Sequence, residues 1–129
     1  MTIEFKISDI IPSTPSVIYD AWLSSSGHSQ MTGSAAHASH EIGFVFDAWD
    51  GYISGANVAL DHGNRIIQSW RTDQFDNEHP DSQIEIILEP VSGGTLLTLH
   101  HTSAPDGQGH YEQGWQTHYF DPMRTYFSS

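Results

Sequence analysis

Residues 83–101 read QIEIILEPVSGGTLLTLHH, and this stretch decides the fold of the 129-residue chain. Apolar residues recur at every second position in both of its halves, which is the periodicity of a half-buried β-strand. The Gly93–Gly94 pair favours a reversal of the chain between the two halves. We therefore predict two antiparallel strands that turn a common set of residues toward the core: Ile84, Ile86 and Leu88 from the first, and Leu97, Leu99 and His101 from the second.

Four more strands are expected upstream of this hairpin. The first segment of the chain alternates apolar and polar residues, and three later runs are rich in strand-forming residues. Asp50–Gly51 and residues 61–64 supply turns between these later runs. The expected strands cover residues 3–8, 42–46, 52–60, 65–71, 83–89 and 95–101.

Two short helices are expected between the first and second strands. Thr14 and Pro15 form a favourable helix start, because a Thr N-cap accepts an amide hydrogen bond and Pro suits the first helical position. Apolar residues then follow at helical spacing: Val17, Ile18, Ala21 and Trp22. A second short helix or turn is expected through Gln30 and Met31.

The last segment of the chain is predicted to be a long amphipathic helix. Large side chains recur along it at three- and four-residue spacing: Tyr111, Trp115, Tyr119, Met123 and Tyr126. Pro122 should kink this helix, because proline has no amide hydrogen to donate to the carbonyl of His118. A helix with one such stripe is suited to cover the apolar face of the sheet.

These elements predict an α+β fold, in which an antiparallel sheet of about six strands is wrapped around a long C-terminal helix. Two short helices follow the first strand. A length of 129 residues and a hydrophobic share of 37% are typical of one compact domain, so we assign residues 1–129 to a single domain. A curved sheet that grips a helix leaves space between them, and a ligand would bind in that space.

Charge and composition exclude several classes of protein. The chain has 16 acidic and 4 basic residues, a formal net charge of −12, whereas nucleic acids and anionic membrane surfaces require clustered Lys and Arg. It has no cysteine, which excludes disulfides and thiolate chemistry. No apolar run approaches the roughly 18 residues of a spanning helix, and residues 1–6 show no signal-peptide pattern. We therefore expect a cytoplasmic protein that neither inserts into membranes nor binds nucleic acid.

Six short motifs along the chain are typical of one known superfamily. They are Pro15-x-x-Ile18-Tyr19-x-Ala21-Trp22, Gly43-x-x-Phe46, Asp50-Gly51-Tyr52-Ile53-x-Gly55, Arg65-Ile66-Ile67-x-x-Trp70-Arg71, Gly93-Gly94-Thr95-x-Leu97-x-Leu99-x-His101 and Tyr111-x-x-Gly114-Trp115. With these motifs in this order, the chain resembles the START-like (SRPBCC, Bet v-type) helix-grip superfamily nearly from end to end. Within it, the chain is similar to bacterial proteins related to the C-terminal domain of the Hsp-90 ATPase activator.

The resemblance implies a ligand-binding role. Members of the superfamily bind lipids, sterols, polyketides and plant hormones, and a minority catalyse cyclisation or dehydration. The bacterial branch is largely without an assigned activity. We therefore expect a small-molecule binding protein that holds a hydrophobic or aromatic ligand between the sheet and the C-terminal helix.

Two alternatives remain open, because fold does not determine function. One is a cavity enzyme of the cyclase or dehydratase type that uses His101 together with a tyrosine, although no convincing pair of acid and base supports it. The other is a co-chaperone or protein-interaction module with a chaperone partner. We rank it below ligand binding, because we expect the chain to lack the additional N-terminal domain of the activator. An exposed apolar patch would indicate a homodimer.

Six residues are expected to form the ligand site. The candidate walls are the aromatic residues Tyr52, Trp70, Tyr111 and Trp115, since Tyr and Trp combine a large apolar area with one polar group. Phe46 is expected to close the mouth, as are Trp49 and Met31. His101 is expected to point inward beside the walls, where its imidazole would bond to the ligand. Ordinary core packing is the alternative for the aromatic residues, and a tyrosine hydroxyl or a backbone carbonyl is the alternative partner of His101.

The remaining polar residues indicate neither a metal nor a cofactor. Adjacent residues of a strand point to opposite faces, so His100 and His101 cannot share an ion, and no HExxH pair occurs among the nine histidines. A Gly-x-Ser-x-Gly motif and a lysine-containing phosphate loop are also absent. Arg65 and Arg71 share one face of a strand, and we expect surface ion pairs for them, with a carboxylate ligand at the cavity mouth as the alternative.

Overall fold

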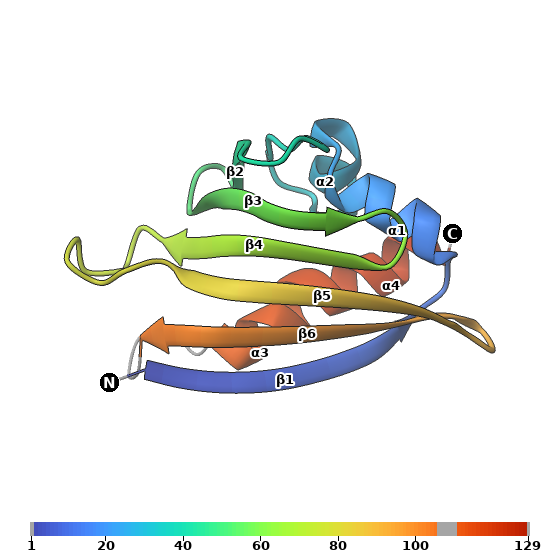
Figure 1. Ribbon diagram of the computed structural model, residues 1–129. Coiled ribbons are helices and arrows are strands. Elements are labelled where there is room, and N and C mark those ends of the chain that lie inside the picture. Colours follow the sequence, from blue (N-terminus) through green and yellow to red (C-terminus); the bar gives the residue numbers. More distant parts are fainter. Residues whose placement is uncertain (1, 106–110, 129) are drawn as a thin grey trace.

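The computed structural model describes residues 2–105 and 111–128, which form a six-stranded antiparallel sheet and a layer of helices (Figure 1). The strands are β1 (Thr2–Ile11), β2 (Val45–Ala48), β3 (Ile53–Asp61), β4 (Arg65–Thr72), β5 (Ser82–Val91) and β6 (Gly94–Pro105). Their order across the sheet is β1-β6-β5-β4-β3-β2. From β2 onward each strand pairs with the next in sequence, while β1 pairs with β6.

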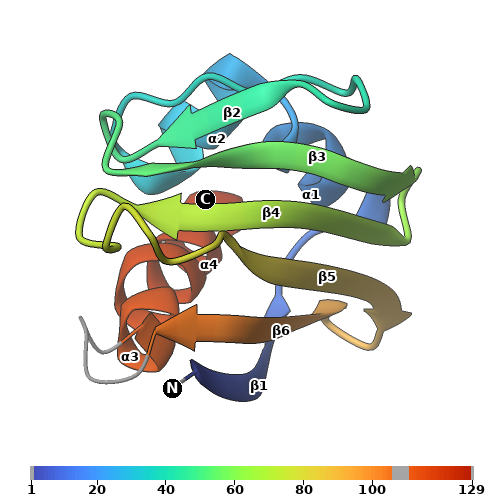
Figure 2. The ribbon, with the colours of Figure 1, turned by 60° about the vertical axis from the view of Figure 1, so that its left-hand side comes forward.

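The helices lie on one side of this sheet. They are α1 (Pro15–Trp22), α2 (Ser25–Thr32), α3 (Tyr111–Trp115), η1 (Gln116–Phe120) and α4 (Asp121–Phe127). The last three follow one another as a C-terminal helical run that crosses the face of the sheet, with α1 and α2 at one end of it (Figure 1, Figure 2). The predicted α+β helix-grip fold is thus confirmed.

The pairing of β5 with β6 builds the centre of the core. Direct cross-strand partners are Ile84 and His101, Ile86 and Leu99, and Leu88 and Leu97. All six side chains are buried, as predicted from their alternation. Because side chains alternate between faces, a slip of one residue would move this whole set to the opposite face of the sheet.

Both short helices begin at capping residues. The Thr14 hydroxyl accepts a hydrogen bond from the Val17 amide at 3.3 Å, and Pro15 occupies the first turn of α1 as predicted. The Ser24 hydroxyl accepts from the Gly27 amide at 3.2 Å in the same way. A side-chain oxygen thus replaces the intrahelical partner that these first amides lack.

The second strand begins later than predicted. The sequence predicts a strand over residues 42–46, whereas β2 begins at Val45. The Phe44 amide instead donates to the Glu41 carbonyl at 3.2 Å, and Gly43 adopts a φ of 84°, so this segment is a turn. The four apolar residues around Gly43 resemble a strand in sequence, but a residue with left-handed φ cannot continue an extended ladder.

The C-terminal helical run is irregular where the sequence predicts a kink. η1 is π-helical, and the Asp121 amide donates to the Gln116 carbonyl five residues earlier. Pro122 follows directly and has no amide hydrogen for the carbonyl of His118, so the α-helical pattern is interrupted here. The interruption takes the form of one wider turn, after which the run continues as α4 (Figure 1). Such turns are frequent at functional sites, and this one carries His118 and Tyr119.

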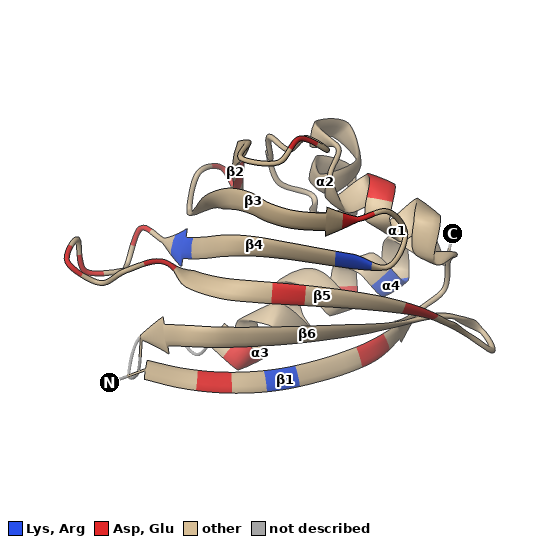
Figure 3. Cartoon of the chain, viewed as in Figure 1, with Lys and Arg blue, Asp and Glu red and all other residues tan. Residues whose placement is uncertain are grey.

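Figure 3 marks the charged residues along the chain, and none of those that the structure describes is buried. Arg65 pairs with Glu85 and Arg71 pairs with Asp81, so the surface ion pairs expected for the two arginines of β4 are confirmed. Within the described residues, no helix combines the length and the apolar character needed to cross a bilayer.

Gly55 permits a close approach of β3 to β4, and it provides a test of the packing. A Cβ on Gly55 would overlap the Ser69 carbonyl and lie 2.9 Å from the Phe46 ring. We predict that Gly55→Ala lowers the free energy of unfolding by about 1–3 kcal/mol in urea denaturation. Gly114→Ala is the matched control, because a Cβ there meets no atom within 4 Å and Ala is favoured over Gly in a helix. Equal stability of the two variants would contradict this packing.

Candidate functional site

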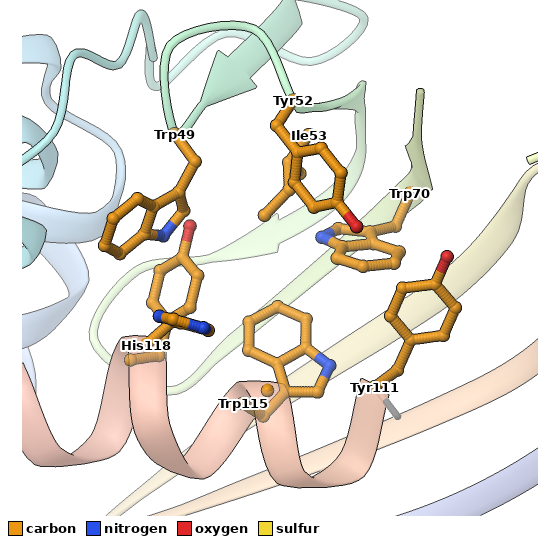
Figure 4. Close-up of a pocket in the computed structure, with 9 residues that line it drawn as sticks. Trp49, Tyr52, Ile53, Trp70, Tyr111, Trp115 and His118 are labelled. Carbon is orange, nitrogen blue, oxygen red and sulfur yellow. The ribbon is translucent and has the colours of Figure 1, made fainter. Parts of the chain in front are cut away.

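A cavity of about 380 Å³ lies between the sheet and the C-terminal helical run (Figure 4). Its lining is largely aromatic and consists of Trp49, Tyr52, Ile53, Trp70, Tyr111, Gly114, Trp115, His118 and Tyr119. In the part of the chain that the structure describes, no Lys, Arg, Asp or Glu lines it. The lining therefore suits an uncharged group with a large apolar surface.

The helical side of the cavity follows from residue spacing. Tyr111, Trp115 and Tyr119 are four residues apart, so they lie on one face of the run. Gly114 and His118 follow two of them at three-residue spacing and share that face. Because Gly114 has no side chain, it leaves open space in the wall: a Cβ at this position would meet no atom within 4 Å.

The sheet side is formed by inward residues of β3 and β4 and by the turn that precedes β3. Trp70 is a buried residue of β4, while Trp49 and Tyr52 come from the turn between β2 and β3 (Figure 4). Trp49 and Asp50 have φ angles of 53° and 57°, which non-glycine residues seldom adopt. This turn places Trp49 against His118, with 5.2 Å between ring centroids.

The aromatic rings of the wall form a continuous layer. Ring centroids of Trp70 lie 5.4 Å from those of both Trp115 and Tyr111. The Trp115 ring lies 4.8 Å from Tyr119, which in turn lies 4.9 Å from Trp22 of α1. Tilted and edge-to-face pairs of this kind contribute about 0.5–1.5 kcal/mol each beyond the burial of area. These contacts hold the wall residues in fixed orientations.

Four of the lining rings have their polar atoms bonded to other protein groups. The pairs are Tyr52 with Gln74 (3.1 Å), Tyr111 with Thr72 (3.0 Å), Trp115 with His101 (3.0 Å) and Tyr119 with His28 (2.8 Å). A buried polar group without a partner costs about 1–3 kcal/mol, so these bonds stabilise the wall. Burial raises the pKa of Tyr111 and of Tyr119, so both hydroxyls keep their protons.

His101 is at the centre of a hydrogen-bonded chain behind the cavity. Its Nε2 lies 2.9 Å from the Ser82 hydroxyl, which donates its own hydrogen to the Trp70 carbonyl at 2.7 Å. Nε2 must therefore carry the imidazole proton, and Nδ1 accepts from the Trp115 indole. Burial lowers the pKa of His101 to about 3, and the adjacent His100 adds to this effect.

A second buried histidine, His28, supports Tyr119 in a similar way. Its Nδ1 lies 2.9 Å from the Trp22 carbonyl, to which it must donate, so Nε2 accepts from the Tyr119 hydroxyl. Burial lowers the pKa of His28, although the bond to Trp22 opposes this shift. The sequence does not single out His28, because α2 is mostly polar and has no apolar stripe to identify its buried side.

A further chain of buried polar groups attaches the segment before β2 to the sheet. The Trp22 indole donates to Gln68 at 3.2 Å, and the Gln68 amide donates to Asn57 at 2.9 Å. The Asn57 side chain donates to the carbonyls of Ser39 and Glu41, each at 2.8 Å. This chain fixes the position of the segment that leads into the cavity rim.

The structure separates the six residues expected at the site into two groups. Tyr52, Trp70, Tyr111 and Trp115 line the cavity. Phe46 and His101 do not line it: Phe46 is buried opposite Gly55 of β3, and His101 lies behind Trp70 and Trp115. His101 is therefore a core histidine whose hydrogen bonds are made within the protein, which is the alternative that the sequence left open. Its partners are Ser82 and Trp115, not a tyrosine hydroxyl or a backbone carbonyl.

Which other residues line the cavity could be seen only in the three-dimensional structure. Trp49 lines the cavity, whereas Met31 is buried in the core and does not line it. Gly114, His118 and Tyr119 were not expected in the site. Their three- and four-residue spacing from Tyr111 and Trp115 is the signal that could have identified them.

Several histidines outside the core lie beside surface carboxylates. His100 contacts Glu4, and His37 contacts Asp47. Among the described residues, no group of three His, Asp or Glu side chains is arranged to hold a metal ion.

An antiparallel sheet that grips a C-terminal helix around an aromatic cavity defines a protein of the helix-grip class. Residues 12–128 match the family described as "Activator of Hsp90 ATPase homolog 1-like protein". The chain belongs to this family, and the resemblance found in the sequence is confirmed.

The chain is similar to curated relatives that are much longer. It is 28% identical over 126 residues to "Activator of 90 kDa heat shock protein ATPase homolog" from Dictyostelium discoideum, covering 95% of this chain and 32% of the relative. It is 25% identical over 124 residues to the mouse "Activator of 90 kDa heat shock protein ATPase homolog 2", covering 95% and 37%. The chain thus spans about a third of the length of these relatives.

Two solved structures illustrate the shared fold. An HSP90 activator from Plasmodium falciparum has a TM-score of 0.86 at 20% identity, covering 98% of this chain and 96% of that one. The Aha1 dimer from Colwellia psychrerythraea has a TM-score of 0.78 at 13% identity, covering 94% and 93%.

Burial of neutral His101 predicts a pH dependence of stability. Below its ordinary pKa of 6.5 the unfolded chain binds a proton on this residue, whereas the folded protein does so only near pH 3. Stabilisation present above pH 6.5 is therefore lost as the pH falls toward 3, at about 1.4 kcal/mol per pH unit. We predict that His101→Gln reduces the slope of unfolding free energy against pH by about this amount between pH 4.5 and 6, in urea denaturation.

Carboxylates titrate in the wild type and in the variant, so their contribution cancels in the comparison of slopes. If His101→Gln does not fold, the wild-type imidazole provides the test by nitrogen-15 NMR. It should remain the neutral Nε2–H tautomer at pH 5, and a protonated ring at that pH would contradict the assignment.

Proposed function

We propose that this protein binds a small hydrophobic or aromatic molecule in the cavity between the sheet and the C-terminal helical run. The observation that carries the proposal is the lining: of the nine lining residues that the structure describes, six are Tyr or Trp, and none is Lys, Arg, Asp or Glu. Aromatic walls around open space lack van der Waals partners on one side, and a ligand that fills the space regains those contacts. A cytoplasmic location is part of the same proposal.

The dimensions of the cavity support this proposal. Its volume of about 380 Å³ lies within the range of roughly 300–1,000 Å³ that is usual for small-molecule sites. Burial of about 200 Å² of apolar ligand surface would favour binding by about 5 kcal/mol before entropic costs. A compound of two or three fused rings is the size of ligand we expect.

An enzymatic role has less support. Both nitrogens of His101 are engaged by Ser82 and Trp115, and Trp70 and Trp115 separate the imidazole from the cavity. The low pKa of His101 also keeps the ring neutral, so it is a poor general acid. The tyrosine hydroxyls that line the cavity are bonded to protein groups as well.

A second candidate function is interaction with a chaperone, and it follows from the family. Both curated relatives are named as activators of a 90 kDa heat shock protein ATPase. Exposed apolar side chains on or beside β2 and β3 offer a contact surface for such a partner or for a second copy of the chain: Ile42, Val45 and Val58. A surface contact of this kind is compatible with an occupied cavity.

Filling the cavity tests the ligand-binding proposal. We predict that Gly114→Leu lowers the affinity for naphthalene at least about tenfold, because a leucine side chain would occupy the open space beside Trp115. Gly114→Ala adds only a methyl group and should retain most of the binding. Affinity is measured by quenching of tryptophan fluorescence, with circular dichroism to verify the fold.

Native mass spectrometry of freshly purified protein complements this measurement. A recurring small molecule in the wild type and in Gly114→Ala, but not in Gly114→Leu, would identify the natural ligand. Equal naphthalene affinities in all three proteins would place binding outside the cavity and refute the proposal. A pull-down of chaperones would then be the next experiment.

A further inference from the structure

Strand β1 leaves one long edge of the sheet open (Figure 1). It is ten residues long and pairs with β6 on one side only. Among the described residues, its backbone from Thr2 to Ile10 forms no backbone hydrogen bond outside the pairing with β6. The opposite edge differs, because β2 has four residues and His37 exchanges backbone hydrogen bonds with Asp47 at 3.0 and 3.1 Å. An open edge such as that of β1 presents N–H and C=O groups to which another strand can bond.

The side of β1 that faces the helices is apolar and only partly covered. Ile3, Phe5 and Ile7 alternate along it, and each is half-buried against the core. Ile3 and Ile7 also line a groove between β1 and the C-terminal helical run. A strand added beside β1 would cover these side chains with its own residues on the same face.

The opposite side of β1 carries one acidic and one basic residue. Glu4 bonds to His100 through Oε2, and its side chain is 63% exposed. Lys6 is exposed and has no ion pair among the described residues, although each of the three arginines has one. A Lys on an open edge discourages strand addition. A strand that binds here must therefore place a carboxylate opposite Lys6.

The order of residues in β1 makes a second copy of the strand complementary to it. Residues directly opposite each other in an antiparallel pair lie on the same face of the sheet. When Phe5 lies opposite Phe5 of the second copy, Ile3 meets Ile7 on the apolar side. On the outer side Glu4 meets Lys6, and both contacts occur twice because the pairing is symmetric.

Other registers of the same pairing are unfavourable. A shift of two residues places Lys6 opposite Lys6 in one direction and Glu4 opposite Glu4 in the other. Like charges that lie directly opposite each other destabilise a strand pair. A shift of one residue would bring apolar side chains opposite charged ones. Both faces are therefore satisfied in the register centred on Phe5.

The backbone of β1 is regular enough for this pairing. The register shift between β1 and β6 arises in β6, where two residues stand opposite Glu4, and the exposed and half-buried residues of β1 alternate without a break. The Ile10 amide donates to the Asp9 carboxylate at 2.8 Å, so it points away from β6. Because amide directions alternate along a strand, the Lys6 amide also points toward the open edge.

We propose that β1 is a docking surface for a second copy of this chain, which pairs antiparallel with it about a twofold axis at Phe5. The two six-stranded sheets then form one continuous sheet. β1 does not line the aromatic cavity, so such a dimer forms whether or not the cavity is occupied. The net charge of −12 on each copy opposes association, and salt favours the dimer by screening this repulsion.

Charge reversal tests the pairing of Glu4 with Lys6. At about 0.15 M salt, we expect the wild type to reach twice the 14.4 kDa mass of the chain in a sedimentation concentration series. Lys6→Glu and Glu4→Lys each place like charges opposite one another at two points, so each should weaken dimerisation at least about tenfold. Both residues are exposed, and circular dichroism verifies that the variants fold.

An equimolar mixture of these two variants is the decisive sample. Every acidic residue at positions 4 and 6 of one variant then meets a lysine of the other, so the mixture should dimerise although neither variant does so alone. A mixture that stays monomeric would overturn the proposal, and so would a wild type that stays monomeric throughout the series.

A disulfide tests the register. The chain has no cysteine, so Phe5→Cys introduces one thiol in each copy. The twofold axis places the two Cα atoms about 4.5–5.5 Å apart, which suits a disulfide. We expect oxidised glutathione to convert this variant to a covalent dimer, while the glutathione is reduced to two thiols. Ile3→Cys is the matched control, because its thiol would lie about 14 Å from its equivalent. Equal yields of covalent dimer from the two variants would contradict the register.

A variant at the other edge of the sheet distinguishes this interface from one at β2 and β3. Val45→Asp removes an exposed apolar side chain of β2 and should leave the dimer unchanged. A dimer that persists in Lys6→Glu and dissociates in Val45→Asp would refute docking at β1.

Discussion

The hydrogen bond from the Trp115 indole to His101 joins the C-terminal helical run to the middle of the sheet, and much of the interior is arranged around it. It requires the imidazole to be neutral with its proton on Nε2, which in turn requires the Ser82 hydroxyl as acceptor. Since these groups are buried, the loss of one leaves another unsatisfied. The bond therefore sets the rotation of α3 relative to β6, and so the direction of the aromatic stripe.

The wall of the cavity and its rim differ in whether their buried polar atoms have hydrogen-bond partners in the protein. Behind the wall, the polar atoms of Trp115 and Tyr119 bond to histidines, which are kept neutral by burial. At the rim, Trp49 is buried at its nitrogen and has no partner among the described residues. The polar atoms of the wall are thus bonded within the protein, whereas the Trp49 indole N–H is not.

Membership of the Hsp90 ATPase activator homologue family accounts for the fold but leaves the cavity to be explained from its own residues. The structural neighbours keep the same architecture at 13–20% identity, because burial pattern and strand register can be preserved by many sequences. A cavity of this kind differs from ordinary core in one respect. Its aromatic residues are positioned by protein contacts on one side and face open space on the other.

Periodicity in the sequence was sufficient to predict the strands and helices that bury one face. The alternation in residues 83–101 and the stripe from Tyr111 to Met123 determine which side chains point inward, because strand and helix geometry repeat locally. Only the tertiary structure decided which inward residues line the cavity and which lie behind it. His101 shares its strand face with Leu99, yet its distance from the open space depends on how Trp70 and Trp115 pack. The start of β2, the burial of His28 and the orientation of Trp49 likewise depend on backbone turns and partners distant in sequence, which no local pattern records.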